Sequence, residues 1–225
     1  MPGFSFMARR LFDLIVFDWD GTLSDSTALI VNSLQAAVVD AGGKKPSTAS
    51  ALYVIGMGLR QALEYLAPDI APEKHLEMAA SYRHHYALGQ HDIHLFPGVL
   101  EMLHELKHQH YWLAIATGKS RRGLNEALAH TVLKDIFDAS RTADETQSKP
   151  HPLMLEELIR AFAVSPERTL MIGDTTHDLE MAHHAGCASI GVSYGAHEPA
   201  AFPQWNPKAV LHTPLELHQW LVDFA

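Results

Sequence analysis

Two aspartates follow an apolar run near the start of the chain. Residues 17–22 (FDWDGT) place the carboxyl groups of Asp18 and Asp20 two positions apart. Side chains alternate along a strand, so both carboxyl groups point to the same side if the strand continues through them. Two such charges are unstable together unless a cation lies between them or one carboxyl holds a proton. The pair therefore predicts chemistry in which one aspartate is a nucleophile and the other an acid and base.

A second acidic segment follows another apolar run. Residues 169–172 (TLMI) lead into Gly173-Asp174 and, four residues later, Asp178. Mg²⁺ prefers oxygen ligands and keeps several waters, so a few converging carboxylates are enough to bind it. The same spacing is also typical of a helix start, where Asp178 would be an N-terminal helix residue. Together with Asp18 and Asp20, the segment predicts a metal site.

Two further segments offer donors to an anion. Thr117 and Gly118 end the apolar run 112–116 (WLAIA), and they supply a hydroxyl group and an unobstructed backbone N–H. Lys149 precedes a proline, which restrains the backbone that carries this point charge. Taken alone, most Thr-Gly pairs are turns and most lysines are solvated. Next to paired carboxylates, these residues predict a phosphate-binding site.

Short apolar runs must position these residues. The runs read as strands because they are continuously apolar, which is typical of strands covered on both faces. The expected strands are 11–17, 112–116, 169–172, 188–192 and 209–211. The expected helices between them are 99–108, 122–130, 153–162, 179–185 and 215–222. This alternation predicts an α/β fold with a Rossmann-like parallel sheet, in which ligands bind at the carboxyl ends of the strands.

Residues 26–93 interrupt the alternation. No strand pattern is evident there, and glycine and proline residues separate stretches with helical spacing. The expected helices of this segment are 28–41, 60–66 and 73–86. We therefore expect a discontinuous α/β core of residues 1–25 and 94–225, with an all-helical cap domain of residues 26–93 inserted into it.

Composition narrows the class of partner. The 225 residues include 26 acidic and 17 basic side chains, which give a formal net charge of −9. Nucleic-acid binders normally carry a basic excess, so we expect no nucleic-acid partner. The single Cys187 excludes an intramolecular disulfide, and no apolar run reaches the length of about 18 residues that a membrane span needs. These features predict a cytoplasmic protein without a membrane partner, either a monomer or a homodimer.

In this order, the four segments resemble the motifs of the haloacid dehalogenase-like hydrolases. The resemblance rests on residues 18–23 (DWDGTL), Thr117, Lys149 and residues 173–178 (GDTTHD), and it covers nearly the whole chain. Within that family, the continuation to residues 25–26 is most similar to phosphoglycolate phosphatases. The resemblance implies a phosphatase with a small helical cap that acts on a small phosphorylated metabolite.

The resemblance also implies a role for each matching residue. Asp18 would attack phosphorus and form an aspartyl phosphate, which divides one difficult hydrolysis into two displacements. Asp20 would protonate the leaving oxygen and then activate the water that cleaves the intermediate. Mg²⁺ would be held by Asp18, the backbone carbonyl of Asp20 and Asp174, with Asp178 as a ligand or a neighbour of the ligands. The transferring phosphoryl group would be bound by Thr117, Gly118 and Lys149.

Asp20 separates the alternatives within the family. Dehalogenases of the family lack this second aspartate, because a halide leaving group needs no proton. A phosphosugar mutase would keep both carboxylates and remains an alternative, although mutases often carry valine at the position of Thr22. A catalytically idle binding protein is a third interpretation, and the complete set of motif residues counts against it.

The cap is expected to select the substrate. Residues 55–60 (IGMGLR) resemble a cap loop that faces the active site. Gly56 would allow close backbone approach, and Arg60 would meet a carboxylate or a second phosphate of the substrate. Alternatively, Gly56 starts a helix and Arg60 faces solvent. His177, inside the second acidic segment, is expected to shape its loop rather than to bind metal.

Overall fold

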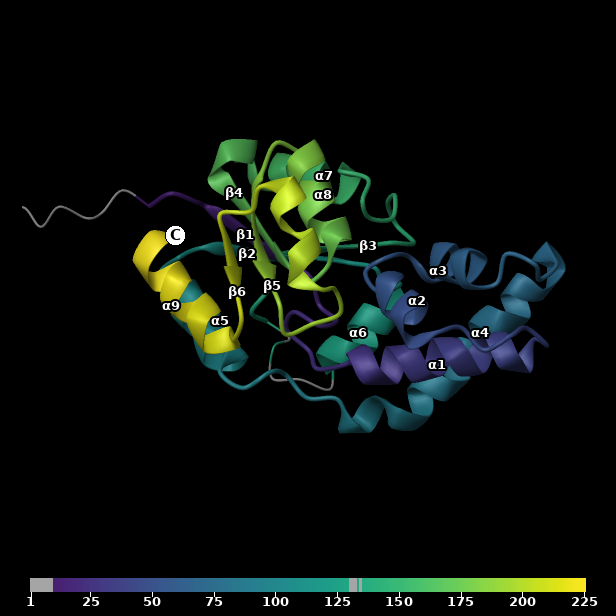
Figure 1. The fold of residues 1–225 in the computed structure, drawn as a ribbon. Helices are drawn as coiled ribbons and strands as arrows, with labels where there is room; N and C mark the ends of the chain where they lie inside the picture. Colours follow the sequence, from purple (N-terminus) through teal and green to yellow (C-terminus); the bar gives the residue numbers. More distant parts are fainter. Residues whose placement is uncertain (1–9, 130–132, 134) are drawn as a thin grey trace, which may run out of the picture.

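The sheet of this protein has six parallel strands in the order β3-β2-β1-β4-β5-β6 (Figure 1). The computed structural model describes residues 10–129, 133 and 135–225; residues 1–9 of the predicted core and residue 130 of a predicted helix lie outside them. The strands are β1 Leu14–Phe17, β2 Trp112–Thr117, β3 Ala139–Thr142, β4 Thr169–Gly173, β5 Ala188–Val192 and β6 Ala209–Leu211. Because β1 pairs with both β2 and β4, their carboxyl ends lie side by side. The predicted α/β fold with a parallel sheet is confirmed.

Helices cover both faces of the sheet (Figure 1). Leu14 and Val16 of β1 pack with the buried residues of α7 and α8. Ile15 and Phe17 pack on the opposite face, with the buried residues of α5, α6 and α9. These helices are α5 Val99–His108, α6 Arg121–Ala129, α7 Leu153–Phe162, α8 Thr176–His184 and α9 Pro214–Phe224. Burial on both faces explains why the central strands are continuously apolar.

Strand β3 was not predicted. Its sequence, ASRT, has no apolar run, and three of its four residues are only half-buried. It pairs with β2 alone, at the edge of the sheet. An edge strand needs less apolar surface than a central one, so the pattern that identified the other strands is missing here.

Residues 26–93 form a group of four α-helices and two short 3₁₀ helices (Pro72–Lys74 and Gln90–Asp92) between β1 and α5, here called the helical insert. The α-helices are α1 Thr27–Asp40, α2 Thr48–Tyr53, α3 Leu59–Leu66 and α4 His75–Gly89. Their apolar side chains, including Leu34, Leu63 and Met78, form a cluster distinct from those on the sheet. Figure 1 shows the insert gathered to one side of the sheet. Within the described residues, no helix combines the length and the apolar character that crossing a membrane requires.

Helix α2 was missed because it is only six residues long, below the length at which a helical period is readable. Its start is fixed locally: the side chain of Ser47 accepts a hydrogen bond from the backbone N–H of Ser50 at 3.0 Å.

Candidate active site

The ends of β1 and β4 bring three carboxyl groups together. Asp18 follows β1, and its backbone N–H donates to the carbonyl of Ile172 in β4 at 2.9 Å. Asp174 follows β4, and Asp178 lies in the first turn of α8. All three side chains are buried, and one oxygen of each lies within 4.8 Å of the others. The parallel pairing of the two strands therefore places both acidic segments at one point.

Lys149 is the cation among these carboxyl groups. Its Nζ donates to Oδ1 of Asp178 at 2.6 Å and lies 2.7 Å from Oδ1 of Asp18, and its side chain is fully buried. We call Asp18, Lys149, Asp174 and Asp178 the Lys149 site. Three carboxyl groups face one ammonium group, so full ionisation leaves negative charge unbalanced. The structure thus brings Lys149, which the sequence predicts as a phosphate-binding residue, next to Asp18 and Asp178.

Burial and the neighbouring charges shift the pKa values of the Lys149 site. Burial raises the pKa of Asp18 to about 7, against the opposing effect of Lys149. Burial, together with repulsion by Asp18 and Asp178, also raises the pKa of Asp174 well above its usual range. Burial opposes the charge of Lys149, but Asp178 and Asp18 outweigh it and raise the lysine pKa. The metal-free site therefore favours additional positive charge.

A divalent cation fits the Lys149 site. Both carboxyl oxygens of Asp18 are buried; Oδ1 lies 2.7 Å from the Lys149 ammonium group, and Oδ2 has no donor among the described residues. The oxygens of Asp174 are oriented by the Thr22 hydroxyl at 2.9 Å and the Ala196 backbone N–H at 2.7 Å. Buried carboxylate oxygens with excess negative charge are a donor set that hard cations prefer. The side chain of Asp20 is not part of this group.

Asp178 was predicted to be either a residue of a metal site or an N-terminal helix residue, and its contacts agree with both interpretations. Its Oδ2 accepts from the backbone N–H of Thr175 at 3.1 Å, and the backbone N–H of Asp178 lies 3.4 Å from the Thr175 hydroxyl, which forms a capping box for α8. Its other oxygen accepts from Lys149. The same residue therefore begins the helix and contributes to the acidic cluster.

Asp20 lies beside a second buried lysine. Its Oδ1 accepts from the Ser26 hydroxyl at 2.6 Å and lies 3.0 Å from Nζ of Lys119. Lys119 follows Gly118 after β2, and its Nζ also donates to the hydroxyl of Tyr86 in α4 at 2.9 Å. We call Asp20, Lys119 and Tyr86 the Lys119 contact. It joins the core to the helical insert.

Sequence reasoning missed Lys119 and Tyr86. Lys119 directly follows the Thr-Gly pair at a strand end, and that position was the available signal. Tyr86 lies in a helix of mixed polarity that contains one other tyrosine and three histidines. No pattern in the sequence distinguishes it.

The loop before α3 lies directly on the end of β2. A Cβ atom on Gly118 would lie 2.5 Å from the carbonyl oxygen of Met57 and 2.6 Å from that of Gly56. Gly56 has a φ of +92°, and its own Cβ would lie 3.0 Å from the hydroxyl of Thr175. Thr117, buried at the end of β2, accepts from the backbone N–H of Lys119 at 3.2 Å. Gly56 and Gly118 therefore meet where the insert covers the site, and neither position has room for a side chain.

Further contacts hold the insert in this closed position. The backbone N–H of Gly58 donates to the hydroxyl of Ser148 at 2.6 Å. The carbonyl of Tyr53 lies 2.8 Å from Nε2 of His177 and 3.0 Å from Nε2 of His197. Burial lowers the pKa of both histidines, which favours their neutral forms. His177 thus contacts the insert and is not a member of the acidic cluster.

Arg60 is not brought to the carboxylates. Its Nε donates to Oε1 of Glu64 at 2.8 Å, one helical turn away, and its side chain is 89% exposed. In this closed position of the insert, Arg60 faces solvent, as the alternative interpretation of the loop expects.

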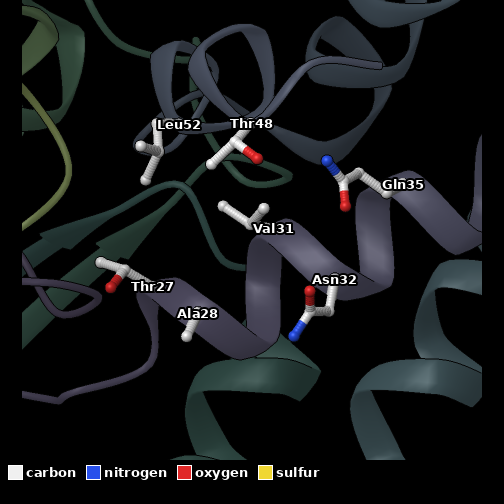
Figure 2. A pocket seen from close by; sticks show the side chains of 7 residues that line it. All are labelled: Thr27, Ala28, Val31, Asn32, Gln35, Thr48 and Leu52. Carbon is white, nitrogen blue, oxygen red and sulfur yellow. The ribbon is translucent and has the colours of Figure 1, made fainter. Parts of the chain in front are cut away.

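A hollow on the insert lies apart from the Lys149 site. Figure 2 shows it between α1 and α2, and its volume is about 330 Å³. Its lining consists of Thr27, Ala28, Val31, Asn32, Gln35, Thr48 and Leu52. None of these side chains is acidic, basic or strongly nucleophilic, in contrast to the buried carboxyl groups of the Lys149 site.

Known proteins resemble this chain along most of its length. The family model described as haloacid dehalogenase-like hydrolase matches residues 15–192. A phosphoglycolate phosphatase of Aliivibrio fischeri is 31% identical, with 88% of this chain and 91% of the relative covered. A pyrophosphatase of Halalkalibacterium halodurans is 30% identical, with 90% and 94% covered.

Solved structures agree with the sequence comparisons. The solved structure of a haloacid dehalogenase-like family hydrolase from Streptococcus pneumoniae superimposes with a TM-score of 0.79 at 25% identity, and the match covers 93% of this chain and 98% of that one. The family model, the relatives and the solved structure therefore indicate one family. The chain belongs to the haloacid dehalogenase-like hydrolases and is an enzyme of that family.

Proposed function

We propose that this enzyme is a Mg²⁺-dependent phosphatase that hydrolyses small phosphate monoesters through an aspartyl phosphate at Asp18. The observation that carries the proposal is the state of Asp18. Its two oxygens are buried among a lysine and two further carboxyl groups: the Lys149 ammonium group lies 2.7 Å from Oδ1, and Oδ2 has no donor among the described residues. The oxygen without a donor retains its lone pairs for attack on phosphorus.

The chain's own residues account for the two displacements. An oxygen of Asp18 attacks phosphorus, and the bond from phosphorus to the leaving oxygen breaks as Asp20 gives that oxygen a proton. Asp20 then takes a proton from water, which attacks the same phosphorus and restores the Asp18 carboxylate. Lys149, Thr117 and the backbone of Gly118 bind the transferring phosphoryl oxygens. Lys149 already lies 2.7 Å from Asp18, where that group would form.

Asp18, Asp174 and Asp178 would hold the metal, together with the backbone carbonyl of Asp20. When bound, Mg²⁺ supplies positive charge that offsets the repulsion between Asp18 and an anionic phosphate. The unbalanced negative charge of the Lys149 site and the raised pKa of Asp18 support a divalent cation there.

We further propose that residues 26–93 are a cap domain on a core of residues 1–25 and 94–225. Support comes from the contacts of Gly56, Gly58 and Tyr53 with the core, which close the site. The substrate is then a small molecule enclosed between cap and core, and the names of the relatives favour phosphoglycolate or pyrophosphate. The single cysteine favours a cytoplasmic setting. Arg60 is left out of the proposed site.

Phosphate release tests the proposal. The purified chain is incubated with p-nitrophenyl phosphate, phosphoglycolate, pyrophosphate and sugar phosphates, with Mg²⁺ or with a chelator. We expect inorganic phosphate from at least one small ester and its loss with the chelator. Interconversion of sugar phosphates without free phosphate would identify a mutase instead. Absence of turnover on the whole panel would favour a binding protein.

A further inference from the structure

The Lys119 contact links Asp20 to the helical insert. Oδ1 of Asp20 lies 3.0 Å from Nζ of Lys119, and the same Nζ donates to the hydroxyl of Tyr86 at 2.9 Å. The Tyr86 ring also lies against this ammonium group, with its centroid 4.6 Å from Nζ. One cation therefore contacts a carboxylate of the core and a phenol of α4 at the same time.

The side chains that form this contact are largely shielded from water. The side chain of Lys119 is only 9% exposed and that of Asp20 only 12%. Burial opposes the charge of Lys119, but Asp20 outweighs it, with Tyr86 and Tyr82 adding to the effect, and the lysine pKa is raised. A buried ammonium group needs its acceptors, because water does not replace them. If the insert moves away, Lys119 loses the Tyr86 hydroxyl and gains freedom of rotation.

The contacts of Asp20 also distinguish its two oxygens. Among the described residues, both recorded side-chain partners of Asp20, Lys119 and Ser26, contact Oδ1. Ser26 immediately precedes α1, so it too lies at the junction with the insert. Oδ1 is thus the held oxygen, and Oδ2 remains for exchange of a proton with a ligand. A carboxyl group anchored at one oxygen has a defined direction for the other.

We propose that Tyr86 and Lys119 are positioning residues that aim Oδ2 of Asp20 at the leaving oxygen only while the insert is closed. The inference rests on the proposed phosphatase function. In the first displacement, which Asp20 enters protonated, an oxygen of Asp18 bonds to phosphorus and the bond from phosphorus to the leaving oxygen breaks. The electron pair of the broken bond stays on the leaving oxygen, and the proton moves there from Oδ2 of Asp20. The resulting Asp20 carboxylate is balanced by Lys119. Closure of the insert and protonation of the leaving group are thereby coupled through one lysine.

The dependence on the leaving group tests this role. Tyr86→Phe removes only the hydroxyl, and Lys119→Met removes the cation. The value of kcat/KM is measured with Mg²⁺ for p-nitrophenyl phosphate, whose leaving group needs little protonation, and for phenyl phosphate, whose leaving group needs more. Since kcat/KM covers the steps up to departure of the leaving group, later hydrolysis does not mask the effect. Tyr65→Phe, at an exposed tyrosine of the insert, is the matched control.

We expect Tyr86→Phe to lower kcat/KM for phenyl phosphate by about tenfold and for p-nitrophenyl phosphate by less than about twofold. Lys119→Met should widen this gap, Lys119→Arg should partly restore it, and Tyr65→Phe should match the wild type. Equal losses on both substrates, or none, would overturn the positioning role while leaving the phosphatase function standing. A wild-type chain that releases no phosphate from these two esters or from any other substrate of the panel would instead contradict the proposed function, and this inference with it.

Discussion

The Lys149 site and the Lys119 contact each place a buried ammonium group beside an aspartate of the same motif, but they differ in charge and in origin. All residues of the Lys149 site lie outside the helical insert, and the site contains three carboxyl groups and one lysine. The Lys119 contact pairs one carboxylate with one lysine and takes its third member from the insert. The first therefore calls for a cation, whereas the second is balanced and depends on closure.

The largest effect is expected at the Lys149 site. Asp18→Asn replaces one carboxylate oxygen with an amide nitrogen and removes the negative charge of the nucleophile, so kcat should fall on the order of 10⁴-fold. Phosphate release is measured with the best substrate of the panel at saturating Mg²⁺. Asp69→Asn, an exposed aspartate of the insert, is the control and should keep wild-type activity. An Asp18→Asn enzyme within tenfold of the wild type would exclude Asp18 as the nucleophile.

Lys149→Met removes the cation but leaves its carboxyl partners buried. We expect kcat/KM to fall about 10²- to 10³-fold, as for loss of one positioned donor to transition-state charge. Breaking a buried pair should also cost about 3–5 kcal/mol of unfolding free energy in the metal-free protein. Denaturant unfolding with a chelator measures the second effect. Exposed Lys208→Met is the control, and equal behaviour of the two variants would contradict the importance of Lys149.

Gly118→Ala is expected to affect the contact between insert and core without affecting the Lys149 site. The added Cβ would lie 2.5 Å from the Met57 carbonyl, so the insert must shift away from the core. We expect kcat/KM to fall about 10²-fold, since displacements of about 1 Å near the chemistry have such effects. Mg²⁺ affinity, measured by calorimetry, should stay within twofold because the Lys149 site lies in the core. Gly123→Ala, whose Cβ has no contact under 3.4 Å, should leave both values unchanged.

Acid should act on the Lys149 site through proton competition. Asp18 has its pKa raised to about 7, so below that pH a proton occupies the carboxyl that the cation needs. Mg²⁺ binding should therefore be about tenfold weaker at pH 6 than well above the pKa. Calorimetric titrations at pH 6 and pH 8 measure the ratio. The same affinity at both values would show that Asp18 does not bind the metal.

The same raised pKa fixes the sign of a stability effect without metal. The folded state holds the Asp18 proton more tightly than the unfolded state, so this contribution to stability is present at acidic pH. It is lost as the pH rises through about 7. The chelated protein should accordingly melt at a lower temperature at pH 8 than at pH 6, and Mg²⁺ should restore more at pH 8. In Asp18→Asn this group's part of the pH dependence disappears.

Sequence patterns predicted most of the strands of the core and the polar residues at their ends. The central strands are buried on both faces, so they could be recognised in the sequence as continuous apolar runs. The polar residues at the ends of β1, β2 and β4 come directly after these runs. Strand β3 was missed because an edge strand of sequence ASRT needs no apolar run. Helix α2 was missed because six residues carry no clear period.

The limits of prediction at the site have a physical cause. Asp18 and Asp174 follow from strand ends and parallel order alone, whereas Lys149 was identified from the proline that follows it and from the family resemblance. The Lys119 contact depends on where α4 packs, and an amphipathic pattern does not say which tyrosine will meet which lysine. Arg60 shows the converse: the motif drew attention to the loop, but the Arg60 side chain is exposed and pairs with Glu64 one helical turn away.

The smallest effect is therefore expected at Arg60, which belongs to neither region. Because its side chain is exposed and one turn from its partner, the pair contributes little, as exposed ion pairs generally do. Arg60→Ala should change KM and kcat for phosphoglycolate by less than about twofold. A large rise in KM confined to carboxylated substrates would show that Arg60 turns inward when substrate binds.

The most direct measurement is the location of the phosphoryl group during turnover. The enzyme is mixed with substrate and Mg²⁺, quenched in acid within one turnover, digested and mapped by mass spectrometry. The account predicts a phosphoryl group on the peptide that contains Asp18, and none at that peptide in Asp18→Asn. Turnover with the phosphoryl group on another residue, or on no residue at all, would contradict the central role of Asp18.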